Sequence, residues 1–254
     1  MAEAASALRV ERLTGPRPTP LIRDVSLEVP HGETRLVLGP IQAGKSMLMR
    51  HIVGLERPIS GTIQLDGERI DGDAEQDASV RRMRARLGVV FEGSALLTRI
   101  SAMENVELPL LEHTDASPSE ARDAARELLA EVGLSVAEHA APEDLGRSAQ
   151  RRVAIARALA LRPSVLLLDE PTRGLDAYAA HEVDDLLTAL QERHGFGTLI
   201  FSHEVRHAFG SATEIYVMER GSIVAHGDRQ AMESSDLEVV RQLMHRRGDH
   251  ERRA

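Results

Sequence analysis

The chain has 254 residues and a net charge of −9 at pH 7, with four Phe, two Tyr, no Trp and no Cys. The absence of cysteine excludes disulfides and thiolate metal sites and favours a reducing compartment, and the negative charge disfavours a nucleic-acid partner. We expect neither a signal peptide nor a membrane span, because the N-terminus lacks a basic and apolar start and no apolar run approaches about 18 residues.

The first third of the chain reads as short strands joined by turns. Residues 8–13 and 22–29 alternate apolar and polar side chains, as strands with one buried face do. Residues 34–39 predict a short apolar strand that ends in glycine, and a helix follows and closes at Gly54. Residues 61–67 predict another strand and turn, and residues 81–92 predict a basic helix that leads into a buried strand.

From about residue 93 to residue 162 the pattern becomes helical, with Ser148 as the predicted N-cap of its last helix. After Pro163 a strand pattern returns, and helices lie between the first three of four strands. Strands that alternate with helices predict an α/β fold with a largely parallel sheet. The segment 93–162 is therefore expected to be a helical lobe inserted into a sheet domain.

The stretch GPIQAGKS, residues 39–46, matches the pattern G-x-x-x-x-G-K-[ST] and lies between a predicted strand and a predicted helix. Backbone N–H groups and a helix N-terminus can hold phosphate oxygens there. Lys45 is expected to reach the β- and γ-phosphates, and the Ser46 hydroxyl is expected to bind Mg²⁺. The predicted ATP-binding residues are Gly39, Pro40, Ile41, Gln42, Ala43, Gly44, Lys45, Ser46 and Met47.

Two carboxylates end the apolar strand SVLLLDE, and a histidine ends the strand TLIF. Adjacent buried carboxylates are unfavourable unless they face a cation or a solvated cleft. Asp169 is therefore expected to bind Mg²⁺, and Glu170 is expected to polarise the attacking water as the general base. His203 is predicted to lie beside Glu170 and to contact the γ-phosphate or that water.

The stretches GPIQAGKS, VVFEGSAL, RRVAIARALALRPSVLLLDEPT, GLD at 174–176 and FSHE together resemble the nucleotide-binding subunit of ABC transporters over nearly the whole chain. The resemblance implies one domain over residues 1–254. Its fold would be a P-loop NTPase (RecA-like) core, an N-terminal antiparallel β portion and an inserted α-helical lobe. It also implies a head-to-tail dimer around two ATP molecules with Mg²⁺, formed with an identical or a different second ATP-binding subunit. Membrane permease subunits would hold it at the cytoplasmic face of the inner membrane.

The segment 89–114 is similar to the Mla/Mce group, whose ATPases drive phospholipid movement between bacterial membranes. The matching residues are Glu104, Asn105, Pro109, Leu110, Glu112, His113 and Thr114. This resemblance implies that the segment contacts a permease and that the cargo is a phospholipid or a related lipid. It also implies a small regulatory subunit and a lipid-binding substrate protein as further partners.

Four features of the sequence depart from the family pattern. Gln42 replaces a glycine of the phosphate loop, so a side chain is expected to crowd the turn. Residues 15–21 offer no aromatic side chain to stack on adenine, which predicts weaker ATP binding and loose base selectivity. Glu92 replaces the glutamine that faces Mg²⁺, and it is predicted to bind the metal with Ser46 and Asp169. Where the family has L-S-G-G-Q, the chain has Leu145, Gly146, Arg147, Ser148 and Ala149.

In the family, that last stretch contacts the γ-phosphate of the opposite subunit, so Gly146, Arg147 and Ser148 are the predicted trans contacts. Arg147 leaves three alternatives open: an arginine finger on that phosphate, a bulky group that weakens the site, or a surface pair with Glu143 or Asp144. Two functions follow. The first is an ATP-hydrolysing subunit of a lipid transporter, and the second is a degenerate subunit that holds ATP and stabilises the assembly. A soluble ABC protein of repair or translation is disfavoured, because those proteins typically fuse two such units.

Overall fold

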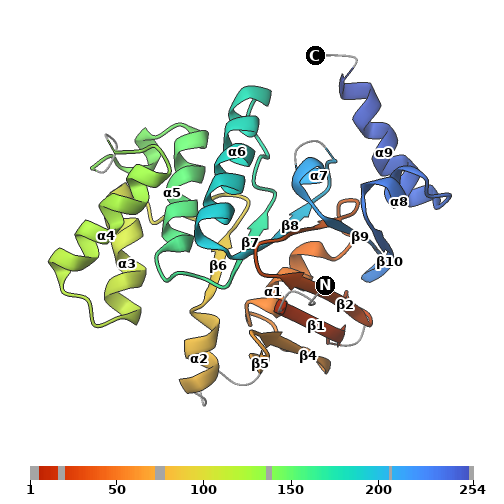
Figure 1. Ribbon diagram of the computed structural model, residues 1–254, viewed down its shortest axis with the longest axis horizontal. Helices are drawn as coiled ribbons and strands as arrows, with labels where there is room; N and C mark the ends of the chain where they lie inside the picture. The colour runs from red at the N-terminus through yellow and green to blue at the C-terminus, as the bar shows by residue number, and fades with distance from the viewer. Residues whose placement is uncertain (1–5, 17–20, 72–77, 136–138, 206–207, 252–254) are drawn as a thin grey trace.

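Two sheets and a group of helices make up the structure, a computed structural model that describes residues 6–16, 21–71, 78–135, 139–205 and 208–251 (Figure 1). The larger sheet has six strands in the order β10-β9-β3-β8-β7-β6, and the smaller has four in the order β2-β1-β4-β5. The strands of the larger sheet are β3 (Thr34–Leu38), β6 (Leu87–Val90), β7 (Val165–Asp169), β8 (Gly197–Ser202), β9 (Glu214–Glu219) and β10 (Ser222–Gly227).

The larger sheet is parallel except for β10, which pairs with β9 in the antiparallel sense. Every residue of β3 and β8 is buried, as expected of central strands covered on both faces. Alternate residues of β7 pack into different cores: Leu166 and Leu168 face the helices, whereas Val165 and Leu167 face the smaller sheet. The predicted parallel α/β arrangement is therefore confirmed.

The smaller sheet is antiparallel and packs with α1 (Lys45–Ile52) against one face of the larger sheet. Its strands are β1 (Ser6–Thr14), β2 (Val25–Pro30), β4 (Ser60–Leu65) and β5 (Glu68–Arg69). The alternation of buried and exposed residues along β2 explains why the sequence pattern identified this strand. The expected N-terminal antiparallel β portion is present.

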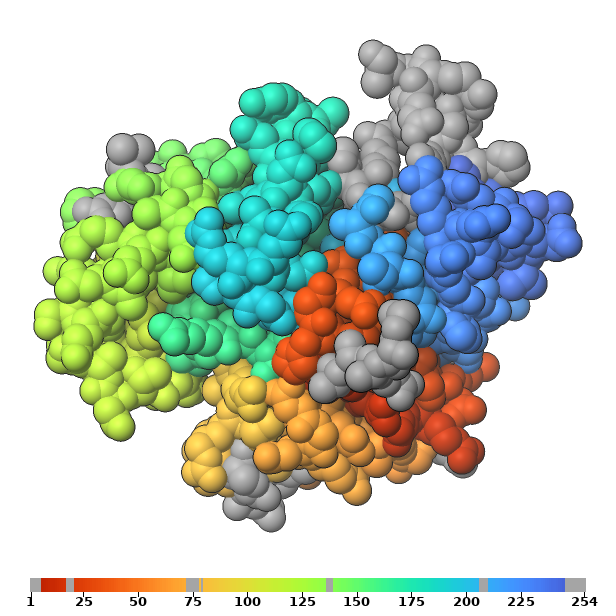
Figure 2. Space-filling view, in the orientation of Figure 1, coloured from red at the N-terminus to blue at the C-terminus, as the bar shows by residue number. Residues whose placement is uncertain are grey.

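The helices α3 (Ala102–His113), α4 (Pro118–Glu131) and α5 (Arg147–Leu159) lie together to one side of the larger sheet. Their surface forms the green lobe in Figure 2, beside α6 (Ala177–His194). Capping boxes start α3 at Ser101 and α4 at Ser117, because each serine exchanges hydrogen bonds with the glutamate three residues later. The remaining helices are α2 (Ala78–Arg84), a 3₁₀ turn (Pro142–Asp144), α7 (Ala208–Ser211), α8 (Arg229–Glu233) and α9 (Glu238–Glu251). Among the helices described, none is long and apolar enough to cross a membrane.

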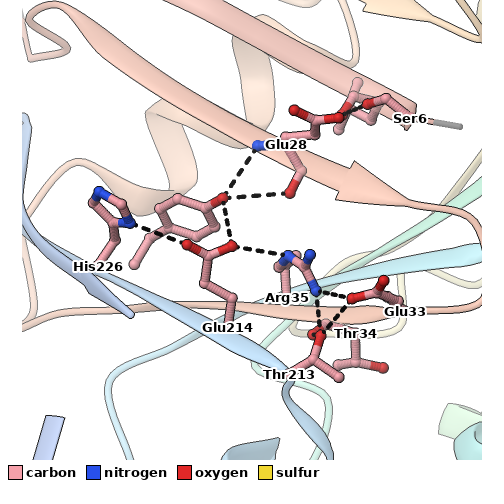
Figure 3. Close-up of polar contacts among 10 residues, drawn as sticks. Ser6, Glu28, Glu33, Thr34, Arg35, Thr213, Glu214 and His226 are labelled. Carbon is pink, nitrogen blue, oxygen red and sulfur yellow. Dashed lines mark hydrogen bonds and ion pairs between the residues drawn. The ribbon is translucent and has the colours of Figure 1, made fainter. Parts of the chain in front are cut away.

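A polar cluster joins the two sheets at the edge where β3 begins (Figure 3). The guanidinium of Arg35 on β3 is buried between the carboxylates of Glu33 and Glu214, at 2.6 and 3.3 Å. The hydroxyl of Tyr216 on β9 accepts a hydrogen bond from the backbone N–H of Glu28 on β2 at 3.3 Å. The pKa of Glu33 lies below its usual value, chiefly because Arg35 donates to its carboxylate. The cluster fixes β2 over the larger sheet at the end opposite the candidate site.

Candidate functional site

The phosphate-loop motif lies where the sequence predicts it, between the end of β3 and the start of α1. The backbone N–H of Gly39 donates to the carbonyl of Ser202 on β8 at 3.1 Å, which ties the start of the loop to the sheet. A side chain at Gly39 would lie 2.3 Å from the carbonyl oxygen of Met218, so only glycine fits this close approach. Gly44 has a φ of 108° and is the N-cap of α1. The strand–loop–helix geometry that holds phosphates is therefore present.

The ammonium group of Lys45 lies inside this loop. Its Nζ donates to the carbonyls of Gly39 and Pro40 at 2.7 and 3.0 Å, and the residue is 7% exposed. Burial lowers the pKa of Lys45, and the charges of Glu170 and Asp169 counteract part of that shift. The lysine thus couples electrostatically to the two acidic residues, while the neighbouring Ser46 is exposed. The ammonium and the two carboxylates therefore lie together at one end of the sheet.

Gln42 adopts a left-handed backbone with a φ of 68°. The expectation that its side chain crowds the turn is wrong, because that side chain is exposed. The consequence lies in the backbone instead: a left-handed conformation costs a non-glycine residue roughly 1–2 kcal/mol. The loop therefore keeps the shape that a glycine would adopt and carries local strain.

The carboxylate of Glu170 is held in place just beyond β7. One of its oxygens, Oε1, accepts from the backbone N–H of His203 at 2.9 Å and lies 2.6 Å from the His203 Nδ1. The other, Oε2, accepts from the Ser202 hydroxyl at 3.1 Å. Glu170 is 8% exposed and has a φ of 48°, a strained backbone of the kind found at functional sites. The position of His203 beside Glu170 agrees with the prediction, whereas Ser202, which directly precedes that histidine, is an additional partner that was not predicted.

Asp169 is the last residue of β7 and is partly exposed. Its pKa rises to about 6, mainly because of burial and then because of the negative charges of Glu170 and Glu92. A cation at this position would relieve that repulsion, and Mg²⁺ prefers oxygen ligands such as this carboxylate and the Ser46 hydroxyl. The donor set therefore fits Mg²⁺, although the described residues contain no group of three or more His, Cys, Asp or Glu side chains arranged around a metal position.

Glu92, the third predicted metal ligand, is engaged elsewhere in this structure. Its carboxylate forms an ion pair with Arg173 at 2.6 Å, and the side chains are 50% and 48% exposed. Its backbone carbonyl accepts from the buried Arg151 of α5, which also donates to the carbonyl of Phe91 at 2.8 Å. Neither Arg151 nor Arg173 was among the predicted site residues. The basic residue in PTRGLD, just after the two acidic residues, was the available signal.

The predicted trans contact lies at the start of α5, where the structure contradicts the expected N-cap and one of the three alternatives for Arg147. The N-cap of α5 is Gly146, with no side-chain cap, whereas Ser148 lies inside the first turn. The guanidinium of Arg147 does not pair with Glu143 or Asp144, since its Nη1 lies 3.5 Å from the carbonyl oxygen of Gly174. The helix starts earlier than predicted because glycine satisfies the extended N-cap conformation.

A pocket of about 580 Å³ opens beside this helix end. Glu92, Arg147, Arg151, Arg173 and Gly174 line it. Of the segment 15–21 that was predicted to face adenine, residues 17–20 lie outside the described part of the chain. Within it, Gly15 is buried, and Pro16 and Leu21 are exposed.

Comparison with known proteins gives consistent matches. The family model described as "ABC transporter" matches residues 22–173. The glutamine transport ATP-binding protein GlnQ of Escherichia coli (strain K12) is 37% identical over 215 residues, which are 85% of this chain and 88% of GlnQ. The lipoprotein-releasing system ATP-binding protein LolD of Anaeromyxobacter dehalogenans (strain 2CP-C) is 37% identical over 223 residues, 87% of this chain and 92% of LolD.

A solved structure of the ATP-binding cassette MJ0796, a dimer in a post-hydrolysis state bound to ADP and Pi, superposes with a TM-score of 0.78. The two chains are 28% identical, and the match covers 87% of this chain and 98% of MJ0796. This structural match confirms the predicted P-loop NTPase fold class.

Proposed function

Because the chain belongs to the ABC transporter family as an ATP-binding subunit, we propose that it hydrolyses ATP to drive a bacterial lipid transporter. The observation that carries hydrolysis is the carboxylate of Glu170. His203 and Ser202 hold it from two sides, and its charge acts on the ammonium of Lys45 in the phosphate loop. A subunit that only holds nucleotide has no need of such an oriented base.

The proposed roles follow from this geometry. The phosphate loop, residues 39–47, and the ammonium of Lys45 bind the phosphates. Ser46 and Asp169 would hold Mg²⁺. The bound ion would neutralise negative charge on the phosphates. Glu170 accepts a proton from the attacking water. The Nδ1–H of His203 donates to Glu170, because a carboxylate can only accept, and this bond keeps the base oriented.

A dimer completes the site in this proposal. The solved MJ0796 cassette is dimeric, and the start of α5 in this chain exposes helix N–H groups that no side chain caps. Gly146, Arg147 and Ser148 would then meet the γ-phosphate held by the opposite subunit. The strained Gln42 and the bulky Arg147 favour the second candidate, a degenerate subunit that binds ATP without turnover. Phosphate release decides between the two.

A permease contact is proposed for the end of α3 within the helical lobe, residues 93–162. A groove of about 710 Å³ lies between α2 and this end, lined by residues that include Arg81, Arg82, Leu110, Glu112 and His113. The similarity of segment 89–114 to lipid-transport ATPases supports a lipid cargo. A permease in this groove would hold the chain at the cytoplasmic face of the inner membrane.

Two measurements test this function. The first is phosphate release from ATP and Mg²⁺ by the chain purified with its membrane partner. Saturable turnover is expected, and ATP binding without phosphate release would favour the degenerate subunit. The second is a pull-down of the membrane partner by the Glu112→Lys variant, with Glu127→Lys on α4 as the control of equal charge change.

We expect the Glu112→Lys variant to lose the membrane partner and the Glu127→Lys variant to keep it. A Glu112→Lys variant that still retains the partner would contradict the proposed contact. Glu104 is unsuitable for this test, because its carboxylate accepts hydrogen bonds from Ser101 at 2.7 Å in the capping box of α3.

A further inference from the structure

The segment Phe91–Gly93 is held to the rest of the site by arginines. Arg151 of α5 is 4% exposed and donates to the backbone carbonyls of Phe91 and Glu92. The Glu92 carboxylate pairs with Arg173 at 2.6 Å. The backbone of this segment is thus anchored on the helical lobe, while its carboxylate is bound to the loop that follows β7.

Arg173 is closely connected to the proposed general base. Its backbone N–H donates to the carbonyl of Glu170 at 3.2 Å, so the two residues share one tight turn. The next residue, Gly174, contacts Arg147 through its carbonyl. This turn therefore lies between Glu92 on one side and the start of α5 on the other. Arg173 is placed to act on Glu92 and on the position of the turn that carries Glu170.

The chemistry of Glu92 explains why it needs a partner. The site already holds the carboxylates of Asp169 and Glu170, and ATP brings a polyanion to it. A third unpaired carboxylate would repel the γ-phosphate, since like charges at short range disfavour binding. A guanidinium 2.6 Å away offsets part of that charge. A glutamine at position 92 would carry no charge and would need no such partner.

We propose that Arg173 is a positioning residue that compensates Glu92: it holds this carboxylate in an ion pair and offsets part of its charge beside the phosphate site, so that the two residues act as one unit in ATP binding. The inference rests on the proposed ATP site but not on hydrolysis. It predicts that Arg173 matters only when residue 92 is a glutamate.

The test is a double-mutant cycle read by equilibrium binding of fluorescent ATP and ADP analogues. Arg173→Ala is expected to weaken ATP binding about fivefold, the scale of a half-exposed ion pair. ADP binding should weaken less, because the γ-phosphate is missing. The loss should persist in EDTA, where no Mg²⁺ screens the phosphates. Glu92→Gln combined with Arg173→Ala should restore wild-type affinity, and Arg173→Lys should retain most of it.

Arg126→Ala is the control, because Arg126 is about as exposed as Arg173 and forms an ion pair with Asp123 on α4. It should leave both affinities unchanged. A double variant that binds as weakly as Arg173→Ala would overturn the compensation, and so would equal losses for ATP and ADP or no loss for either. A wild-type chain that binds ATP without hydrolysing it would contradict the proposed hydrolysis. The double-mutant cycle would still test the compensation, because it is read by nucleotide binding. A chain that binds no ATP would reject both.

Discussion

The Nδ1 of His203 lies 2.6 Å from the Oε1 of Glu170, and the backbone N–H of the same histidine donates to that oxygen at 2.9 Å. One residue thus fixes the carboxylate through both its backbone and its ring. This arrangement sets the direction of the lone pairs of Glu170, which a general base needs before it can accept a proton from water.

Glu170→Gln is expected to lower the rate of ATP hydrolysis by about 10²–10⁴-fold while ATP still binds. The amide oxygen can accept the two hydrogen bonds of His203, and the amide N–H can donate to the Ser202 hydroxyl, so the fold should be kept. Phosphate release and equilibrium ATP binding check both parts. Glu204→Gln is the matched control, since the Glu204 carboxylate lies 3.7 Å from the other ring nitrogen of His203. A Glu170→Gln variant within about threefold of wild type would remove Glu170 from the role of base.

Gln42→Gly is expected to raise the free energy of unfolding by about 1 kcal/mol, because glycine adopts a φ of 68° without a Cβ penalty. For a chain of this size the melting temperature should rise by about 2–4 °C. Thermal denaturation of the nucleotide-free protein measures the change. Gln42→Ala removes the side chain but keeps the Cβ, so it should give no such gain. Equal stabilisation by both variants would show that the side chain, and not the backbone, carries the strain.

Restoring the family pattern with Gly146→Ser, Arg147→Gly and Ser148→Gly is expected to raise ATP hydrolysis in the assembled transporter. A glycine at position 147 permits closer backbone approach to the opposite γ-phosphate. A fall in kcat would instead identify Arg147 as an arginine finger, a group worth about 10³–10⁵ in rate. An unchanged rate would mean that the stretch has no part in catalysis. Arg126→Gly on α4 is the control of equal charge change, because Arg126 lies outside this stretch, and it should leave the rate unchanged.

Asp169→Asn is expected to stabilise the nucleotide-free protein at pH 7.5 but not at pH 4. The pKa of Asp169 is raised to about 6, so the folded state binds this proton more tightly than the unfolded state does. The ionised side chain therefore destabilises the protein above pH 6, and the effect disappears as the pH falls from 6 towards 4. Solvent screening of this partly exposed group limits the gain to about 1 kcal/mol. Denaturant unfolding at several pH values tests it against Asp123→Asn, and a gain that does not depend on pH would contradict the raised pKa.

The fold could be predicted from local patterns because each pattern depends on near neighbours in the chain. Three such patterns agree with the structure: the alternation of buried and exposed residues along β2, the apolar run of β7, and the glycines at positions 39 and 44. The start of α5 could not be predicted in the same way. Ser148 is a good N-cap residue in isolation, but the chain already enters the helix at Gly146. Helix boundaries depend on where the incoming backbone lies, which a propensity does not contain.

By itself, the sequence determined which chemical groups are available at the candidate site: the phosphate loop with Lys45, the acids Asp169 and Glu170, and His203 at a strand end. These follow from the order of strands in a parallel sheet, whose carboxyl ends share one edge. Only the tertiary structure decided the partners of the charged side chains. Glu92 pairs with Arg173, which is 81 positions further along the chain, and Arg147 contacts Gly174. Such pairs depend on distances across the folded chain, and no spacing along the sequence encodes them.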